Sequence, residues 1–272
     1  MPDRITDIPG TAADPIGAAA ESIPSITLEE MDSVKLLNRV DTKYMCSVDV
    51  LLSVLSDARE AGYRALDVDG TKLSPYNSVY FDTPALKMFT DHHNRRLVRQ
   101  KVRTREYVSS GDTYLEIKRK NNHGRTKKKR TSIPLSELND FSGDADAVQY
   151  LAAHSAFTAD MISPVLSTEF SRITLVNPAK TERLTIDSNL RFTNFRTGEK
   201  ASLDTAVIIE LKQDGHAQSQ MKQILLEHRV KPMRVSKYCI AVTLTDPAAK
   251  SGRFKSKVRR IEKIINHKIE VI

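Results

Sequence analysis

Residues 97–107 read LVRQKVRTREY, and basic residues recur at every second position of this stretch. Side chains two residues apart project from the same face of a β-strand, so the spacing predicts one cationic face and one face carrying Val98 and Val102. The cationic face consists of Arg99, Lys101, Arg103 and Arg105. Like charges in one row repel one another, so an anionic ligand or neighbouring carboxylates must compensate them. Taken alone, such a strand is also typical of the solvated outer face of a sheet.

The same alternation recurs in three later segments, at residues 112–120, 125–133 and 206–212. Residues 121–124 (NNHG) have the turn chemistry that joins the first two of these segments into a hairpin. The charged faces carry Glu116 and Lys118, then Lys128 and Arg130, then Glu210 and Lys212. Four strands of this kind are explained better by a closed sheet with a charged interior than by four solvated faces. We therefore predict an α+β fold with a closed antiparallel sheet and flanking helices.

The composition limits the classes of function. The chain has 272 residues, of which 40% are apolar, a net charge of +8 and a pI of about 9.4, and this charge favours polyanionic partners. Nucleic acid is not expected, because aromatic residues for base stacking make up only 6% and tryptophan is absent. Cys46 and Cys239 do not make a disulfide framework. Neither a signal peptide nor a membrane span is recognisable, so a cytoplasmic location is expected.

The organisation along the chain is expected to have three parts. Residues 1–25 are rich in Pro, Gly, Ala and Asp without periodicity, and we expect them to be disordered. Residues 26–246 carry the alternating segments and form the main domain. Residues 247–272 form a basic helix with Phe254, Val258, Ile261 and Ile265 at helical spacing. This helix either packs on its own domain or docks on an anionic membrane surface or a membrane-protein partner.

Seven motifs occur in a fixed order along the chain. They are RVDTKY (39–44), YNSVYFDT (76–83), KVRTREY (101–107), LEIKRK (115–120), KKR (128–130), IIELK (208–212) and VSKY (235–238). In order and spacing, residues 30–245 resemble the catalytic domain of the vacuolar-transporter-chaperone (VTC) polyphosphate polymerases, within the triphosphate tunnel metalloenzyme (CYTH-like) superfamily. The chain departs from that pattern at Arg234, where the family usually has lysine, and at residues 91–96, where a glycine-containing turn is expected.

The resemblance implies that the α+β fold is an antiparallel β-barrel tunnel with flanking helices, and that a set of site residues lies inside the tunnel. The implied catalytic residues are Arg103, Arg105, Lys237 and Glu210. Glu210, with Glu116, is implied to hold Mn²⁺ or Mg²⁺, although either carboxylate could instead be an ion-pair partner that neutralises the interior. The implied phosphate ligands are Lys43, Arg103, Arg105, Lys118, Lys128, Arg130, Arg172, Arg183, Lys212, Arg234, Ser236 and Lys237. Arg99 and Lys101 either extend this set or lie in solvent at the end of the tunnel.

The resemblance implies a polyphosphate polymerase that transfers the terminal phosphoryl group of ATP to a growing inorganic polyphosphate chain and releases ADP. The residue types suit this reaction, because phosphoryl transfer depends on positioning and on neutralising charge rather than on covalent help from the protein. Two alternatives use the same residues. A tunnel triphosphatase would pass the phosphoryl group to water, and a non-enzymatic module would only bind polyphosphate.

Overall fold

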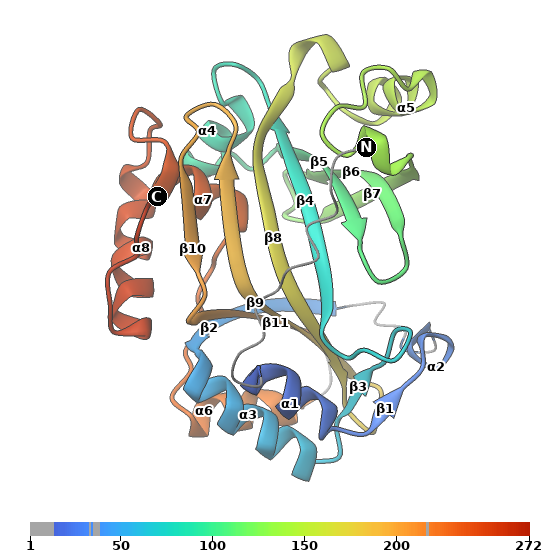
Figure 1. Ribbon diagram of the computed structural model, residues 1–272, viewed down its shortest axis with the longest axis vertical. Coiled ribbons are helices and arrows are strands. Elements are labelled where there is room, and N and C mark those ends of the chain that lie inside the picture. The colour runs from blue at the N-terminus through green and yellow to red at the C-terminus, as the bar shows by residue number, and fades with distance from the viewer. Residues whose placement is uncertain (1–13, 33, 35–38, 216–217) are drawn as a thin grey trace.

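One large, twisted antiparallel sheet organises the fold (Figure 1). The computed structural model describes residues 14–272 except 33, 35–38 and 216–217. The main strands are hydrogen-bonded in the order β2–β11–β9–β8–β4–β5–β6–β7. Their bounds are β2 (Arg39–Ser47), β4 (Ser74–Asp82), β5 (Arg99–Tyr107), β6 (Asp112–Lys120), β7 (Thr126–Ser132), β8 (Ser163–Val176), β9 (Glu182–Asn194) and β11 (Ala206–Asp214).

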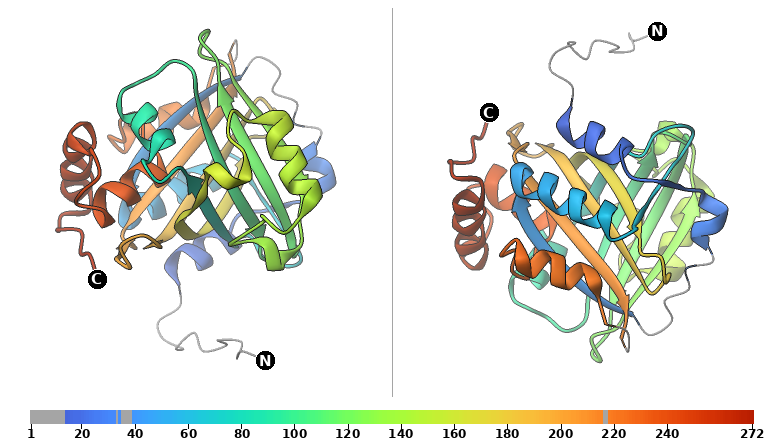
Figure 2. Two further views of the ribbon diagram at one scale, coloured as in Figure 1. Left: turned by 90° about the horizontal axis from the view of Figure 1, so that it is seen from above. Right: turned by 90° about the horizontal axis from the view of Figure 1, so that it is seen from below.

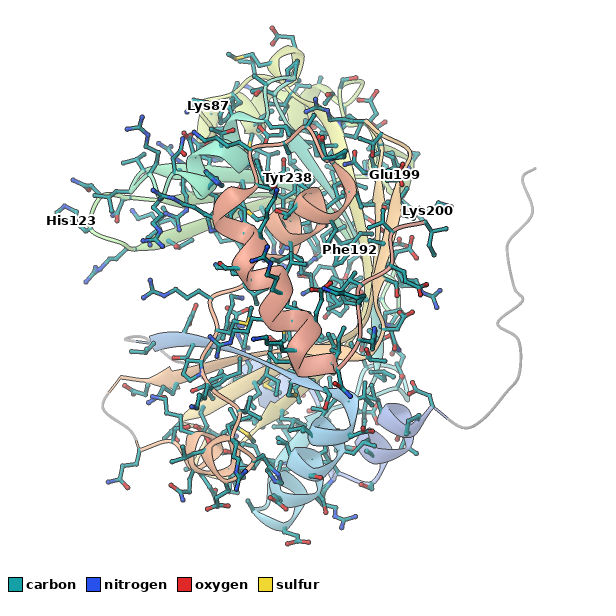
Figure 3. The ribbon with its side chains drawn as sticks, turned by 90° about the vertical axis from the view of Figure 1, so that its left-hand side faces the viewer. Lys87, His123, Phe192, Glu199, Lys200 and Tyr238 are labelled. Carbon is teal, nitrogen blue, oxygen red and sulfur yellow. The ribbon has the colours of Figure 1, made fainter. Side chains whose placement is uncertain are left out.

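Three short strands extend the sheet at its margins. β1 (Ser25–Ile26) pairs in parallel with β3 (Arg64–Leu66), which pairs in turn with β8, and β10 (Lys200–Leu203) forms a hairpin with β9. The predicted hairpin between β6 and β7 is present, and His123 at its tip points away from the rest of the molecule (Figure 3).

The predicted closure of the sheet into a barrel is not observed. Over the residues that the structure describes, no strand pairing joins β2 to β7, so these two strands are the edges of an open sheet. Alternating sequence determines which residues share a face of a sheet. Closure depends instead on strand number, tilt and stagger, which alternation does not encode. The antiparallel α+β architecture is confirmed, whereas the described residues do not show the sheet closing into a barrel.

Two apolar cores lie on the outer face of the sheet. Helices α1 (Pro15–Glu21), α3 (Val48–Glu60) and α6 (Gln220–Glu227) cover the side formed by β2, β11, β9 and β8 (Figure 2, right). Ser47 caps α3, because its hydroxyl accepts a hydrogen bond from the Val50 amide at 3.4 Å. The second core lies against β4, β5 and β6 and includes Leu151 of α5 (Ala145–His154) and Met88 of α4 (Lys87–His93).

The short elements connect these layers. They are α2 (Leu28–Asp32), which contributes Met31 to a small core beneath β1, and two 3₁₀ turns at Leu135–Glu137 and Ala159–Met161.

The third core lies on the inner face of the sheet and holds the C-terminal helices. α7 (Lys237–Thr245) and α8 (Gly252–Ile265) pack against inward-facing residues that include Phe170, Phe192 and Ile208. Tyr238 of α7, labelled in Figure 3, is buried in this core. The apolar stripe of α8 is therefore buried within the fold, which is the first of the two alternatives for residues 247–272. None of the helices in the described ranges is long and apolar enough to span a membrane.

The amino-terminal expectation needs correction for its second half. Residues 14–25 contain α1, whose Asp14 caps the helix by accepting a hydrogen bond from the Ile16 amide at 3.1 Å. Ile16 and Ala20 are buried against α3, and the Lys72 ammonium donates to the Ile23 carbonyl at 2.8 Å. These buried contacts order a segment whose composition alone predicted disorder. The remainder of that prediction, residues 1–13, lies outside the described residues.

Replacing Ile261 by alanine is expected to destabilise the protein, because this α8 side chain is fully buried in the inner core. The expected loss in the free energy of unfolding is about 2–5 kcal/mol, measured by urea denaturation. Arg260→Ala, one residue earlier on an exposed position, is the control and should change stability by no more than about 0.5 kcal/mol. Equal, small effects of both substitutions would show that α8 is not part of the core.

Candidate functional site

Strand register places the predicted interior residues on one face of the sheet. Directly opposed residues of two antiparallel strands project to the same side of the sheet. A series of such residue pairs runs across the sheet from β2 to β7. The pairs are Lys43 with Glu210, Lys212 with Arg183, Arg172 with Asp187, Ser74 with Arg172, Ser78 with Arg105, Arg103 with Glu116, Glu116 with Arg130, and Lys118 with Lys128. We call this surface the charged face. It occupies the part of the inner face that α7 and α8 do not fill.

Glu116 and Arg103 form the central ion pair of the charged face. The Arg103 Nε donates to Glu116 Oε2 at 2.8 Å, and the Lys128 ammonium contacts the other carboxylate oxygen. Burial raises the pKa of Glu116, but Arg103, Arg105 and Lys128 lower it by more, so the carboxylate is ionised with a pKa well below its usual range. Because Glu116 is fully buried and both of its oxygens are engaged, its geometry favours the ion-pair role over metal binding.

Arg105 has no such partner. Its side chain is only 4% exposed, and its Nε donates to the neutral hydroxyl of Ser78 at 2.9 Å. The guanidinium lies 5.4 Å from the ring centroids of both Tyr76 and Phe170. Within the described part of the chain, no carboxylate forms an ion pair with it. Burial, followed by repulsion from neighbouring arginines, lowers its pKa to about 10.

Asp187 organises a second group of cations. Arg172 binds its carboxylate in a bidentate manner, with Nε to Oδ1 at 2.6 Å and Nη2 to Oδ2 at 2.9 Å, and the ammonium of Lys237 also contacts Oδ2. Lys237 is the first residue of α7, for which Ser236 is the N-cap. Burial raises the pKa of Asp187, yet these two cations hold it well below its usual range. Burial lowers the pKa of Lys237 to about 8.

Lys43, Glu210 and Lys212 form a third group at the β2–β11 edge. The Lys43 Nζ lies 2.9 Å from Glu210 Oε2. Burial alone would raise the pKa of Glu210. Lys43 and Lys212 lower the pKa by more than burial raises it, to about 2. Among the described residues, no carboxylate forms an ion pair with the Lys212 ammonium. Burial lowers the pKa of Lys212 to about 8. Next to Glu210 in register lies Thr185, whose buried hydroxyl has no hydrogen-bond partner among the described residues.

Glu210 fits the divalent metal ion that the sequence resemblance implies. Mg²⁺ is typically held by one or two carboxylates together with substrate phosphates and water. The carboxylate of Glu210 is ionised, and its side chain is 23% exposed to solvent. Among the described residues, no group of three or more His, Cys, Asp or Glu side chains could hold a metal ion by itself. A metal at Glu210 would therefore share phosphate oxygens with a substrate.

The remaining predicted residues lie around these groups. Arg130 lies over the ring of Tyr114, 4.3 Å from its centroid. Arg183 is the register partner of Lys212. Lys101 belongs to the charged face, because its ammonium donates to the Ser236 hydroxyl at 2.7 Å. Arg234 lies two residues before Ser236, and its backbone carbonyl accepts a hydrogen bond from Lys257 of α8.

Sequence reasoning missed Asp187 and the aromatic floor of the site. Asp187 shares its strand parity with Arg183, so alternation could have identified it as an inward residue. The stacking of Tyr76 on Phe170, with centroids 5.3 Å apart, depends on the register between β4 and β8. No local pattern in either strand specifies that register.

The fold and the site together define a domain whose antiparallel sheet presents a densely cationic, partly desolvated face. The model of the VTC domain family matches residues 38–245, which is most of the chain. The chain belongs to the VTC domain family, and the resemblance seen in its motifs is confirmed at this level.

Similar solved structures are remote in sequence. A putative adenylate cyclase from Vibrio parahaemolyticus is 10% identical and aligns over 74% of this chain and 96% of its own, with a TM-score of 0.43. A putative adenylyl cyclase from Hippeastrum, described as having a dominant triphosphatase activity, is 14% identical over 80% and 96% of the two chains, with a TM-score of 0.45. The PH1819 protein of Pyrococcus horikoshii is 12% identical over 75% and 99%, with a TM-score of 0.43. A search of curated proteins found no match.

Two arginines two residues apart are expected to differ in their contributions to stability. Arg103→Met leaves the buried carboxylate of Glu116 without its main partner and should lower the free energy of unfolding by about 3–5 kcal/mol. Arg105→Met removes a buried cation that has no carboxylate partner, so stability should be unchanged or increased. Urea denaturation in phosphate-free buffer tests this difference. If both variants lose a comparable amount of unfolding free energy, an anionic group of the ligand-free protein must neutralise Arg105.

Proposed function

We propose that the charged face binds the triphosphate of ATP and directs its terminal phosphoryl group to an inorganic polyphosphate chain. In this reaction a terminal oxygen of the acceptor chain forms a bond to the γ-phosphorus while the bond from the γ-phosphorus to the bridging oxygen of ADP breaks. ADP leaves, and the polyphosphate is longer by one phosphate. Membership of the VTC domain family supports a phosphate-chain ligand.

The observation that carries this proposal is the buried, unpaired guanidinium of Arg105. Desolvating a cation without an anionic partner is costly. A buried, unpaired guanidinium is therefore expected where a bound ligand supplies the missing anion. The planar guanidinium donates hydrogen bonds in a geometry that matches phosphate oxygens. Arg103 lies two residues away on the same face, about 6–7 Å along the strand, which is close to the reach between alternate phosphates of an extended chain.

The surrounding cations suit phosphoryl transfer. The transferred group carries charge on its equatorial oxygens, and fixed donors in a partly dry site stabilise this charge without having to reorient. Arg172 and Lys237 are fixed in this way by Asp187, while Lys118 lies across from Lys101 and Lys128. Repulsion by Arg103, together with burial, lowers the pKa of Lys118 well below its usual value. An incoming phosphate would relieve this repulsion.

Glu210 would hold a divalent ion, Mn²⁺ or Mg²⁺, which would supply additional positive charge to the triphosphate when bound. We propose that the reaction takes place in the cytoplasm, with ATP as the phosphoryl donor. The buried, free thiols of Cys46 and Cys239 support a reducing compartment.

Tripolyphosphate affinity, measured by titration calorimetry at fixed ionic strength, tests the binding step. Arg105→Met should weaken binding about tenfold to hundredfold, because a charge-assisted hydrogen bond typically contributes about 1.5–3 kcal/mol. Arg119→Ala is the control, since Arg119 is exposed and has the opposite strand parity on β6. Its affinity should stay within twofold of the parent protein. If Arg105→Met also binds within twofold, the charged face is not the phosphate site.

Incubation with ATP and Mn²⁺, followed by separation of the phosphate products by chain length, tests the reaction. The proposal predicts polyphosphate and ADP. Glu210→Gln should abolish turnover and leave tripolyphosphate binding intact or tighter, because a negative charge leaves a cationic site. Release of inorganic phosphate alone would identify a triphosphatase, and binding without turnover would identify a non-enzymatic module. Unchanged turnover of Glu210→Gln at saturating Mn²⁺ would refute the metal assignment.

A further inference from the structure

Tyr80 is a buried phenol on the charged face, and the function proposed above does not use its hydroxyl. The residue lies on β4 directly opposite Arg103 of β5. Its ring stacks on Tyr238 of α7, with the two ring centroids 5.1 Å apart. Because this stack fixes the ring, the hydroxyl has a defined position among the cations of the face.

Arg103 joins Tyr80 to Glu116. The Nε and Nη2 of Arg103 donate to Glu116 Oε2, and its Nη1 donates to the Tyr80 hydroxyl oxygen at 3.2 Å. A guanidinium has five N–H donors, so two of them remain for another acceptor, and one of these two belongs to Nη1. A phosphate oxygen that accepts this second N–H of Nη1 would lie next to the Tyr80 hydroxyl.

The proton of the Tyr80 hydroxyl has no acceptor among the described residues. The bond from Arg103 is the only hydrogen bond that these residues make to the hydroxyl, and the hydroxyl accepts it. Leu166, its register neighbour on β8, is apolar. The titratable groups around it on β5 and α7 are Lys101, Arg103, Arg105, Lys237 and Tyr238.

The groups on α7 and the nearest carboxylates do not supply an acceptor either. Burial raises the pKa of Tyr238 well above its usual value, so this phenol is neutral, and it donates to Asp82. Glu116 contacts Arg103, and Asp187 contacts Lys237. An oxygen of a bound phosphate would therefore be the first acceptor for the proton of the Tyr80 hydroxyl.

The cations also determine when the Tyr80 hydroxyl can donate. Burial alone would raise the pKa of Tyr80, but Arg103, Arg105, Lys101 and Lys237 lower it to about 8, against about 10 for an ordinary tyrosine. Without a ligand, the hydroxyl is a donor below about pH 8 and a phenolate above it. A phenolate would pair with Arg103 and repel phosphate. Bound phosphate favours the protonated form and must raise the pKa of Tyr80.

We propose that the Tyr80 hydroxyl is a ligand of the bound triphosphate, donating a hydrogen bond to a non-bridging phosphate oxygen held by Arg103, and that ionisation of this hydroxyl weakens binding. The proposal rests on the function proposed above and adds a neutral, titratable donor to the cations of the charged face. No covalent bond changes, and the proton stays on the phenol. In the alternative, the hydroxyl only orients Arg103 and does not touch the substrate.

The ultraviolet absorbance of tyrosinate, followed against pH, tests the contact directly because the chain has no tryptophan. The parent protein should show the ionisation of one tyrosine near pH 8, and tripolyphosphate should move this step upward by at least about one pH unit. The step should be absent from Tyr80→Phe. Burial raises the pKa of the tyrosines at 44, 63, 76 and 238, which therefore ionise at higher pH.

Tripolyphosphate affinity at several pH values, measured by titration calorimetry at fixed ionic strength, tests the consequence for binding. At pH 7, Tyr80→Phe should bind about tenfold more weakly than the parent protein, because a hydrogen bond to a charged acceptor is lost. Well above pH 8 the parent should bind no more tightly than the variant, because its hydroxyl has lost the proton. Lys212 and Lys237 also titrate near pH 8, but both proteins contain them, so their effects cancel in the comparison.

Tyr44→Phe is the matched control. Tyr44 is equally buried, but it lies in the outer core on the opposite face of the sheet. This variant should keep the tyrosinate step near pH 8, and its tripolyphosphate affinity should stay within twofold of the parent protein at every pH.

The outcomes separate this inference from the proposed function. If the parent protein does not bind tripolyphosphate at any pH, the proposed function fails and the Tyr80 proposal fails with it. If it binds and no tyrosinate step near pH 8 moves upward, only the Tyr80 proposal is overturned. A loss in Tyr80→Phe that is equal at all pH values would also overturn it, because the hydroxyl would then only orient Arg103. The titration of the parent protein needs no variant, so it decides the matter even if Tyr80→Phe does not fold.

Discussion

Repulsion among cations on one face of a single sheet is the constraint on which this structure depends. Three buried or half-buried carboxylates, Glu116, Asp187 and Glu210, divide that face into separate ion-paired groups. Each carboxylate is ionised because the neighbouring cations outweigh the effect of burial on its pKa. The cations still outnumber these partners. The fold therefore tolerates a local excess of positive charge that an anionic ligand would relieve.

The inner face of the sheet serves two purposes along its length. Where inward residues are apolar, as at Phe192 and Ile208, α7 and α8 cover them and complete a core. Where they are charged, α7 contributes its first residue, Lys237, whose ammonium contacts Asp187. Asp82 joins α4 to α7, since its carboxylate accepts hydrogen bonds from the Met88 and Phe89 amides of α4 and from the Tyr238 hydroxyl of α7. This packing of α7 helps to fix the position of Lys237.

Much of the charged face could be predicted from strand parity, because alternation is a local property of each strand. Lys118 and Glu116, for example, face inward as their spacing indicates. Non-local properties could not be predicted. Among the residues that the structure describes, β2 and β7 are not paired, two cations enclose Glu116, and Ser78 is the only polar partner of Arg105. All three features depend on how distant strands meet. The α1 segment was missed because its burial against α3 compensates for a composition that resembles a disordered chain.

The two lysines with lowered pKa values give the site a property of its own. Lys212 and Lys237 have pKa values of about 8, against the usual value of 10.5, so around pH 8 each is only partly protonated. A polyanion brought next to them favours their charged form. Binding would then draw protons from the solution, and the enthalpy observed would depend on the ionisation heat of the buffer. The site would act as a proton acceptor whose positive charge adjusts to the charge of what it binds.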